Sequence, residues 1–128
     1  MMIREILFRA KRIKDAEWIE GDLLHLPDGI AILANGYANI MRGTICQYTG
    51  LTDKNGNKIW ENDIVKKTDR TPLGYMRVRN CRVFFHKLGY WAIKTEFGDI
   101  YWIGEFGSEQ IEVIGNIFDN PEFIEQRK

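Results

Sequence analysis

The local fold of this chain is decided by QYTGLTDKNGNKIWENDIV, residues Gln47 to Val65. The stretch places the sequence Asp53-Lys54-Asn55-Gly56-Asn57 between two runs of strand-forming residues. Aspartate can accept hydrogen bonds from backbone amides two residues on, and Asn-Gly favours positive φ, so a tight turn is predicted. A second bend is predicted at Glu61-Asn62-Asp63, because asparagine is the usual non-glycine residue in the left-handed region. The residues given structural turn roles are Asp53, Asn55, Gly56, Asn62 and Asp63.

Outside this block, apolar residues recur with period two in short runs separated by glycine, asparagine and aspartate, which predicts a mainly β fold. Trp18 to Leu26 and Ile30 to Ala34 are expected to form an N-terminal hairpin. Tyr75 to His86 is expected to form a longer strand with a bulge near Asn80, because its alternation fails midway. Asn120 and Pro121 predict the start of a C-terminal helix of one or two turns.

Composition limits the classes of function. The chain has 128 residues, of which 45% are hydrophobic, and its 18 basic and 18 acidic residues give a formal net charge of zero. This balance excludes a bulk attraction to nucleic acid or to anionic membranes. Charged residues at Arg4 and Glu5 argue against a signal peptide, and no apolar run reaches the length of a membrane span. We therefore expect a cytoplasmic protein that does not bind membranes.

The sequence offers no arrangement of catalytic or metal-binding residues. Cys46 and Cys81 are 35 positions apart with no second cysteine or histidine at metal-ligand spacing, so both are expected to be buried thiols. His25 and His86 have no serine or cysteine at a known nucleophile spacing. Phosphate loops, a dinucleotide-binding fingerprint and a zinc ligand quartet are also missing. We expect a protein that is not an enzyme and that has no cofactor.

The domain organisation has two interpretations. The length predicts one domain spanning residues 1–128. However, Ile19-Glu20-Gly21-Asp22-Leu23-Leu24 resembles Trp60-Glu61-Asn62-Asp63-Ile64-Val65 at an offset of 41 positions, as if each were an aspartate-containing turn leading into an aliphatic strand. The alternative is therefore two β lobes, about 1–45 and 46–128, although a match of six residues is also easily accidental.

Four sequence blocks together resemble the YopX family of bacteriophage and prophage proteins, which has no established activity. They are REILFRAKR from Arg4, EWIEGDLL from Glu17, the central block from Gln47, and VIGNIFDNPEFIE from Val113. Asn62 replaces the usual glycine of the family's Glu-Gly-Asp turn and preserves tolerance of positive φ. The resemblance implies a small, mainly β phage or prophage protein with barrel-like sheets. Together with the strand and turn patterns, it leads us to expect short antiparallel strands in a barrel-like, SH3-like core, with N-terminal hairpins and a short C-terminal helix. It implies no catalytic residues.

The two signs of charge are separated along the chain. Residues 66–87 contain seven basic residues against Asp69 alone, a net charge of +6, whereas residues 95–126 contain eight acidic residues and no lysine or arginine. One interpretation is that the two segments pair, within one sheet or between subunits. The other is a nucleic-acid-binding surface, since small β-barrels bind single strands with basic and aromatic residues. Its candidate residues are Lys66, Lys67, Arg77, Arg79 and Arg82.

We therefore expect a phage accessory protein that acts by binding a host or phage protein, or by forming a homo-oligomer that hides exposed strand edges. A nucleic-acid-binding module remains the alternative. Of the four tryptophans, Trp102 beside Tyr101 and Phe106 is the best candidate for an exposed aromatic patch.

Overall fold

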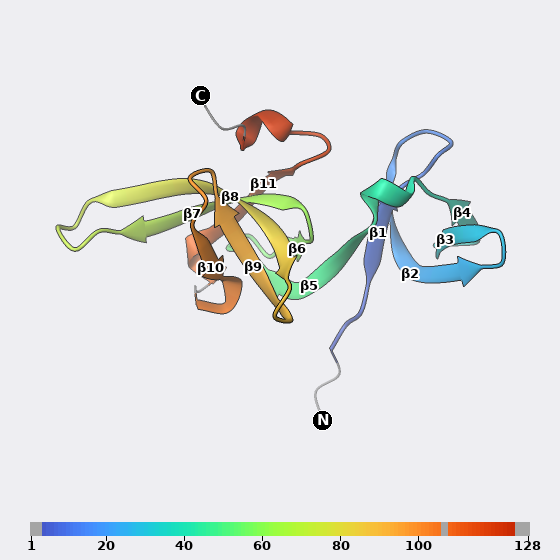
Figure 1. The fold of residues 1–128 in the computed structure, drawn as a ribbon, viewed down its shortest axis with the longest axis horizontal. Coiled ribbons are helices and arrows are strands. Elements are labelled where there is room, and N and C mark those ends of the chain that lie inside the picture. Colours follow the sequence, from blue (N-terminus) through green and yellow to red (C-terminus); the bar gives the residue numbers. More distant parts are fainter. Residues whose placement is uncertain (1–3, 106–107, 125–128) are drawn as a thin grey trace. The chain divides into compact units, whose positions relative to one another are not determined.

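The computed structural model describes residues 4–105 and 108–124 (Figure 1). The chain divides into two compact units, residues 1–50 and 51–128, and each is described by itself. The division falls within strand β5 (Cys46–Thr52), which begins in the first unit and ends in the second.

The first unit is an antiparallel sheet in which the strands follow the order β4-β3-β2-β1-β5. Its strands are β1 (Phe8–Lys11), β2 (Trp18–Leu26), β3 (Gly29–Leu33) and β4 (Tyr37–Asn39), and a 3-10 turn, η1 (Arg42–Thr44), precedes β5. Ala10, Ile32 and Ile40 form its buried core, against which Phe8 and Leu23 pack. The predicted N-terminal hairpin is confirmed as β2 and β3, because Leu26 pairs with Gly29 across a turn at Pro27 and Asp28.

The six-residue match between residues 19–24 and residues 60–65 does not correspond to a structural repeat. Gly21 lies inside the continuous strand β2, where it pairs with Phe8, whereas Asn62 has φ 69° in the turn between β6 and β7. The turn that the duplication would place at Glu20-Gly21-Asp22 is therefore absent, and the strand expected over Trp18 to Leu26 is confirmed as β2. Glycine is needed at position 21 for a different reason: a Cβ there would lie 2.1 Å from the carbonyl oxygen of Leu33.

The second unit contains an antiparallel sheet with the strand order β10-β9-β8-β7-β11. Its elements are β6 (Lys58–Trp60), β7 (Asp63–Arg70), β8 (Met76–His86), β9 (Tyr90–Thr95), β10 (Ile100–Trp102), β11 (Ile111–Asn116), and the 3-10 turns η2 (Ile103–Glu105), η3 (Ser108–Gln110) and η4 (Pro121–Phe123). One face of this sheet, here called the core face, packs on a buried cluster: Ile59, Val65, Cys81, Val83, Ile93, Ile103 and Ile111. The opposite face is called the outer face.

The mainly β prediction is confirmed, but three details differ. The described strands form two open antiparallel sheets rather than a barrel-like core. The expected C-terminal helix is the single 3-10 turn Pro121–Phe123, because the Asn120 side chain accepts a hydrogen bond from the Asn116 amide instead of capping a helix; residues 125–128 lie outside the described part. The bulge predicted near Asn80 is absent from β8, whose register with β7 and β9 is continuous, and a register shift occurs instead between Val113 and Gly115.

The turns of the central block hold the second unit together. The Asp53 carboxylate accepts hydrogen bonds of 2.9 Å from the backbone amides of Asn55 and Asn57 in its own turn, and a third of 2.9 Å from Val113 in β11. Asp63 accepts from the Trp60 amide at 2.8 Å, and Gly56 has φ 80°. The Asp53 carboxylate thus links the central block to the C-terminal block that begins at Val113.

Candidate functional site

The five predicted nucleic-acid-binding residues divide between the two faces of the second sheet. Side chains of a strand alternate between faces, so Lys67, Arg77 and Arg79 share the core face with Val65 and Cys81. Lys66 and Arg82 lie on the outer face. The structure therefore does not bring the five residues together into one basic surface.

The core-face cations have partners within the second unit. Lys67 is only 2% exposed, and its Nζ lies 3.0 Å from Asp69 Oδ2 and 4.1 Å from the centre of the Tyr101 ring. Arg77 Nε lies 3.3 Å from Asp69 Oδ1. The Arg77 guanidinium, followed by the Lys67 ammonium, holds the pKa of Asp69 below its usual range, although burial alone would raise it. The one acid of the segment thus contacts two of its seven basic residues, Lys67 and Arg77.

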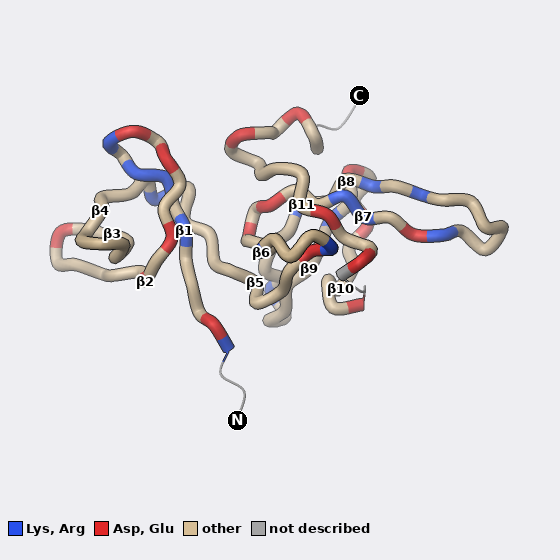
Figure 2. Tube along the Cα trace, turned by 180° about the vertical axis from the view of Figure 1, so that it is seen from behind, with Lys and Arg blue, Asp and Glu red and all other residues tan. Residues whose placement is uncertain are grey.

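Arg79 and Arg82 also make contacts inside the unit. The Arg79 guanidinium carbon lies 5.0 Å from the centre of the Phe97 ring, and Arg82 Nη2 donates to Asn62 Oδ1 at 2.9 Å. From the acidic segment, Glu112 forms an ion pair with Lys54 at 2.7 Å. The tube coloured by charge shows both signs along the hairpin of β7 and β8 (Figure 2).

The β7–β8 hairpin extends past the other strands of its sheet (Figure 1). β11 pairs with β7 as far as Lys67, and β9 pairs with β8 from Cys81 onward. We call residues 68–80 the arm, because among the described residues neither of its strands has a second neighbouring strand. Along β8, Arg77 and Arg79 alternate in step with the buried residues Cys81 and Val83, but they lie on the arm, beyond the end of the core. Charged and buried residues can therefore point to the same face of β8 without a bulge.

Apolar side chains lie exposed on the arm. Leu73 in its turn is 84% exposed, and Tyr75, Met76 and Val78 are exposed as well. The arm is well formed internally, since the Thr71 amide donates to the Tyr75 carbonyl at 2.7 Å and Gly74 adopts φ 89°. The sequence alone does not reveal these residues, because the arm is uncovered only as a result of where β9 and β11 end.

The edge strand β10 carries the second exposed apolar group. Ile100 and Trp102 are exposed on its outer face, and Asp99 immediately before it is also exposed. Tyr101 points to the core face, where it packs against the core. Of the expected aromatic patch, Trp102 is exposed and Tyr101 is not; Phe106 lies outside the described residues.

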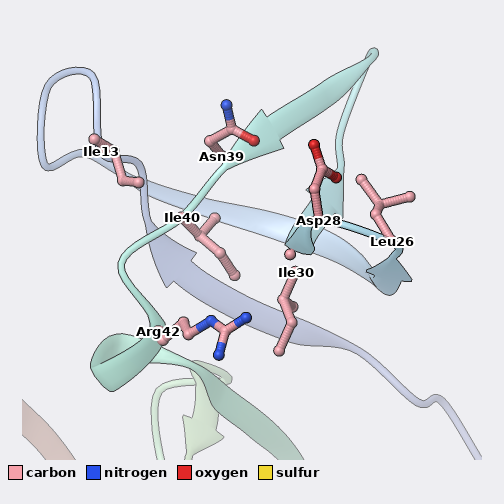
Figure 3. Close-up of a pocket in the computed structure, with 8 residues that line it drawn as sticks. Ile13, Leu26, Asp28, Ile30, Asn39, Ile40 and Arg42 are labelled. Carbon is pink, nitrogen blue, oxygen red and sulfur yellow. The ribbon is translucent and has the colours of Figure 1, made fainter.

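Each unit has a pocket with charged groups in its wall. One, in the first unit, has a volume of about 330 Å³, with Ile13, Leu26, Ile30 and Ile40 among its walls and Asp28 and Arg42 as its charged groups (Figure 3). Such a carboxylate and guanidinium beside apolar walls can orient a small ligand. The other, on the outer face of the second sheet, has a volume of about 210 Å³ and includes Arg82 and Lys94, which lie directly opposite each other on β8 and β9.

Neither metal chemistry nor thiol chemistry is evident in the described part. In residues 4–105 and 108–124, no group of three histidine, cysteine or acidic side chains could hold a metal ion. Cys46 and Cys81 are both buried, as predicted, and burial raises the pKa of the Cys81 thiol to about 11. No helix within the same residues is long and apolar enough to cross a membrane.

Comparisons with known proteins identify the family. The family model described as YopX protein matches residues 7–125. The crystal structure of protein EF1440 from Enterococcus faecalis is similar with a TM-score of 0.51 and 22% sequence identity, covering 94% of this chain and 99% of that chain, which supports the fold. No curated protein matches significantly. Because the family model spans nearly the whole sequence, this chain belongs to the YopX family.

Proposed function

We propose that this chain is a cytoplasmic phage or prophage accessory protein that acts by binding protein, and that it self-associates through the arm. The observation that carries the proposal is a two-stranded arm with exposed Leu73, Tyr75, Met76 and Val78 and no covering strand among the described residues. A two-stranded hairpin alone is only marginally stable in water. Exposed strand edges and contiguous apolar side chains favour pairing with another chain.

The displaced pKa values of the carboxylates have structural causes. In the described residues the carboxylates with displaced pKa values are Asp15, Asp53, Asp69 and Glu112, and all four pKa values are lowered. Hydrogen bonds from Arg12, Arg77 and Lys54 lower the pKa values of Asp15, Asp69 and Glu112 respectively. These causes are ion pairs and turn amides, which are structural roles, whereas a general acid needs a raised pKa.

The direct test replaces the apolar side chains of the arm. We expect the wild-type chain to dimerise in sedimentation velocity, and the double variant Leu73→Ser, Tyr75→Ser to raise the dissociation constant at least about tenfold, since each lost apolar contact is worth about 1–2 kcal/mol. Leu88→Ser is the matched control, because Leu88 is 75% exposed in the β8–β9 turn of the same sheet. A wild-type monomer at every concentration would refute the proposal, as would an equal effect of Leu88→Ser.

Salt distinguishes an apolar contact from the charge pairing predicted between residues 66–87 and 95–126. Apolar burial is maintained or strengthened by added salt, whereas attraction between exposed charges is screened. We expect light scattering to report the same dimer at low and high salt. Dissociation at high salt would instead show that ion pairs, and not apolar side chains, hold the dimer together.

Nucleic-acid binding is the second candidate, favoured by one observation. Arg82 and Lys94 lie opposite each other on the outer face and line one pocket with Glu96, so two cations share this pocket with one acid. This function predicts that a fluorescent single-stranded oligonucleotide binds with an affinity that falls steeply with salt. The variant Arg82→Gln, Lys94→Gln should then weaken binding, with Lys14→Gln in the first unit as the control. No binding at low salt would end this candidate.

A further inference from the structure

The open edge of the arm presents its backbone groups in a defined pattern. The hydrogen bond from the Thr71 amide to the Tyr75 carbonyl places both residues' backbone groups inside the hairpin. Because inward and outward groups alternate along an antiparallel strand, the amides and carbonyls of Met76 and Val78 point away from β7. Phe97, in the β9–β10 turn, approaches the edge at Arg79, so the open edge runs from the tip to about that residue.

β10 is the outermost strand on one side of the same sheet, and its outer edge is patterned in the same way. The Thr95 amide donates to the Asp99 carbonyl at 2.8 Å, which fixes Asp99 and Tyr101 as the residues whose backbone groups face β9. The backbone groups of Ile100 and Trp102 therefore point outward. On both edges the outward-pointing backbone belongs to residues with exposed apolar side chains on the outer face.

The two edges are also complementary in charge. On the core-face side, the arm edge presents Arg77 and Arg79, and the β10 edge presents Asp99 and Tyr101. Arginine pairs favourably with a carboxylate and with an aromatic ring. Apolar side chains would meet on one face of such a pairing, and cations would meet an acid and an aromatic ring on the other.

We propose that Met76 to Arg79 of one copy add as an antiparallel strand to Asp99 to Trp102 of a second copy, with Val78 opposite Ile100. This inference rests on the proposed self-association and names the occupant of the arm edge. The register places Met76 opposite Trp102, Arg77 opposite Tyr101 and Arg79 opposite Asp99. Main-chain hydrogen bonds would provide affinity, and the alternating side chains would fix the register.

Pairing between two copies of the arm edge fits the charges less well. A twofold antiparallel pairing of two β8 edges through their outward groups aligns even-numbered residues with even-numbered ones. In the register centred on Val78, Arg77 then lies opposite Arg79 of the second copy, and in the registers centred on Arg77 or on Arg79 that arginine lies opposite its own copy. Like charges directly opposite are destabilising, so β10 is the better partner.

The test is a disulfide between two singly substituted chains, Val78→Cys and Ile100→Cys. Both side chains are about half exposed, at 47% and 46%, so the substitutions should not disturb folding. Residues in a hydrogen-bonded antiparallel pair have Cα atoms about 5.5 Å apart, within the range of a disulfide. The native Cys46 and Cys81 are buried and should not compete.

We expect mild oxidation of the mixture to give a covalent dimer of the two different chains. Three controls should give little covalent dimer: Val78→Cys alone, Leu88→Cys mixed with Ile100→Cys, and Arg77→Cys mixed with Ile100→Cys, which tests the opposite face. If the wild-type chain dimerises but the Val78→Cys and Ile100→Cys chains do not link, this pairing is refuted while self-association stands. Efficient linking of Val78→Cys to itself would also refute it. A wild-type monomer would refute both proposals.

Discussion

Asp53→Ala should lower the free energy of unfolding of the second unit by about 3 kcal/mol, because three backbone amides lose a buried acceptor that each needs. The Asp53 side chain is buried and accepts from the amides of Asn55, Asn57 and Val113. The Val113 contact joins the turn to a strand 60 positions away, so its loss should also loosen β11. Urea unfolding followed by circular dichroism measures the effect.

Acid provides a second signature of the same contacts. Burial alone would raise the pKa of Asp53, but hydrogen bonds from Val113, Asn57 and Asn55 lower it below its ordinary value. A carboxyl whose pKa is lower in the folded state contributes stability above its unfolded pKa and loses it as the pH falls through the folded pKa. The wild-type chain should therefore lose more stability than Asp53→Ala between about pH 5 and pH 2.

Asp28→Ala is the matched control for Asp53, because Asp28 lies exposed in the β2–β3 turn, whereas Asp53 is buried. It should change stability by less than about 0.5 kcal/mol. Equal stabilities of Asp53→Ala and the wild-type chain, or parallel acid profiles for the two, would show that the carboxylate does not join the turn to β11.

Gly21→Ala should destabilise the first unit by about 3 kcal/mol, since overpacking against backbone cannot be relieved by a side-chain rotation. The added Cβ would lie 2.1 Å from the Leu33 carbonyl oxygen and 3.1 Å from Ile32 Cγ2. Because Asp22 pairs with Leu33, the strain falls on the β2–β3 ladder itself. Amide exchange of peptides covering β2 and β3, measured by mass spectrometry, should become faster.

Gly29→Ala tests whether this effect comes from the close approach rather than from glycine replacement in general. A Cβ at Gly29 meets no heavy atom within 4 Å, although the residue belongs to the same hairpin. Exchange in β2 and β3 should then stay close to that of the wild-type chain. Similar exchange in the two variants would contradict the explanation given for Gly21.

Local turn chemistry made the strands and turns of the second unit predictable. Asp53 and Asn62 act through amides and dihedrals within a few residues, so their residue types carry the signal. The requirement for glycine at position 21 could not be predicted for the opposite reason, because it comes from Leu33 on a neighbouring strand. The prediction of a C-terminal helix was wrong because the Asn120 side chain accepts a hydrogen bond from the preceding Asn116 amide instead of capping a following helix.

The candidate site was less predictable than the fold. Charge along the sequence pointed to residues 66–87. However, the alternation of side chains along β7 places Lys66 and Lys67 on opposite faces, and Asp69 forms ion pairs with Lys67 and Arg77. Which arm residues are uncovered depends on where β9 and β11 end, and the sequence gives no local sign of those limits. The exposed edges could therefore be located only from the topology.

Amide exchange of Met76 and Val78, followed by NMR over a dilution series, tests the central claim that a second copy covers the arm. These amides point outward from the hairpin, so in a monomer they should exchange at rates close to those of exposed amides. We predict strong protection at concentrations where the chain is dimeric and its loss on dilution, while Arg77, bonded within the hairpin, changes little. Fast exchange of Met76 and Val78 at every concentration would contradict the account.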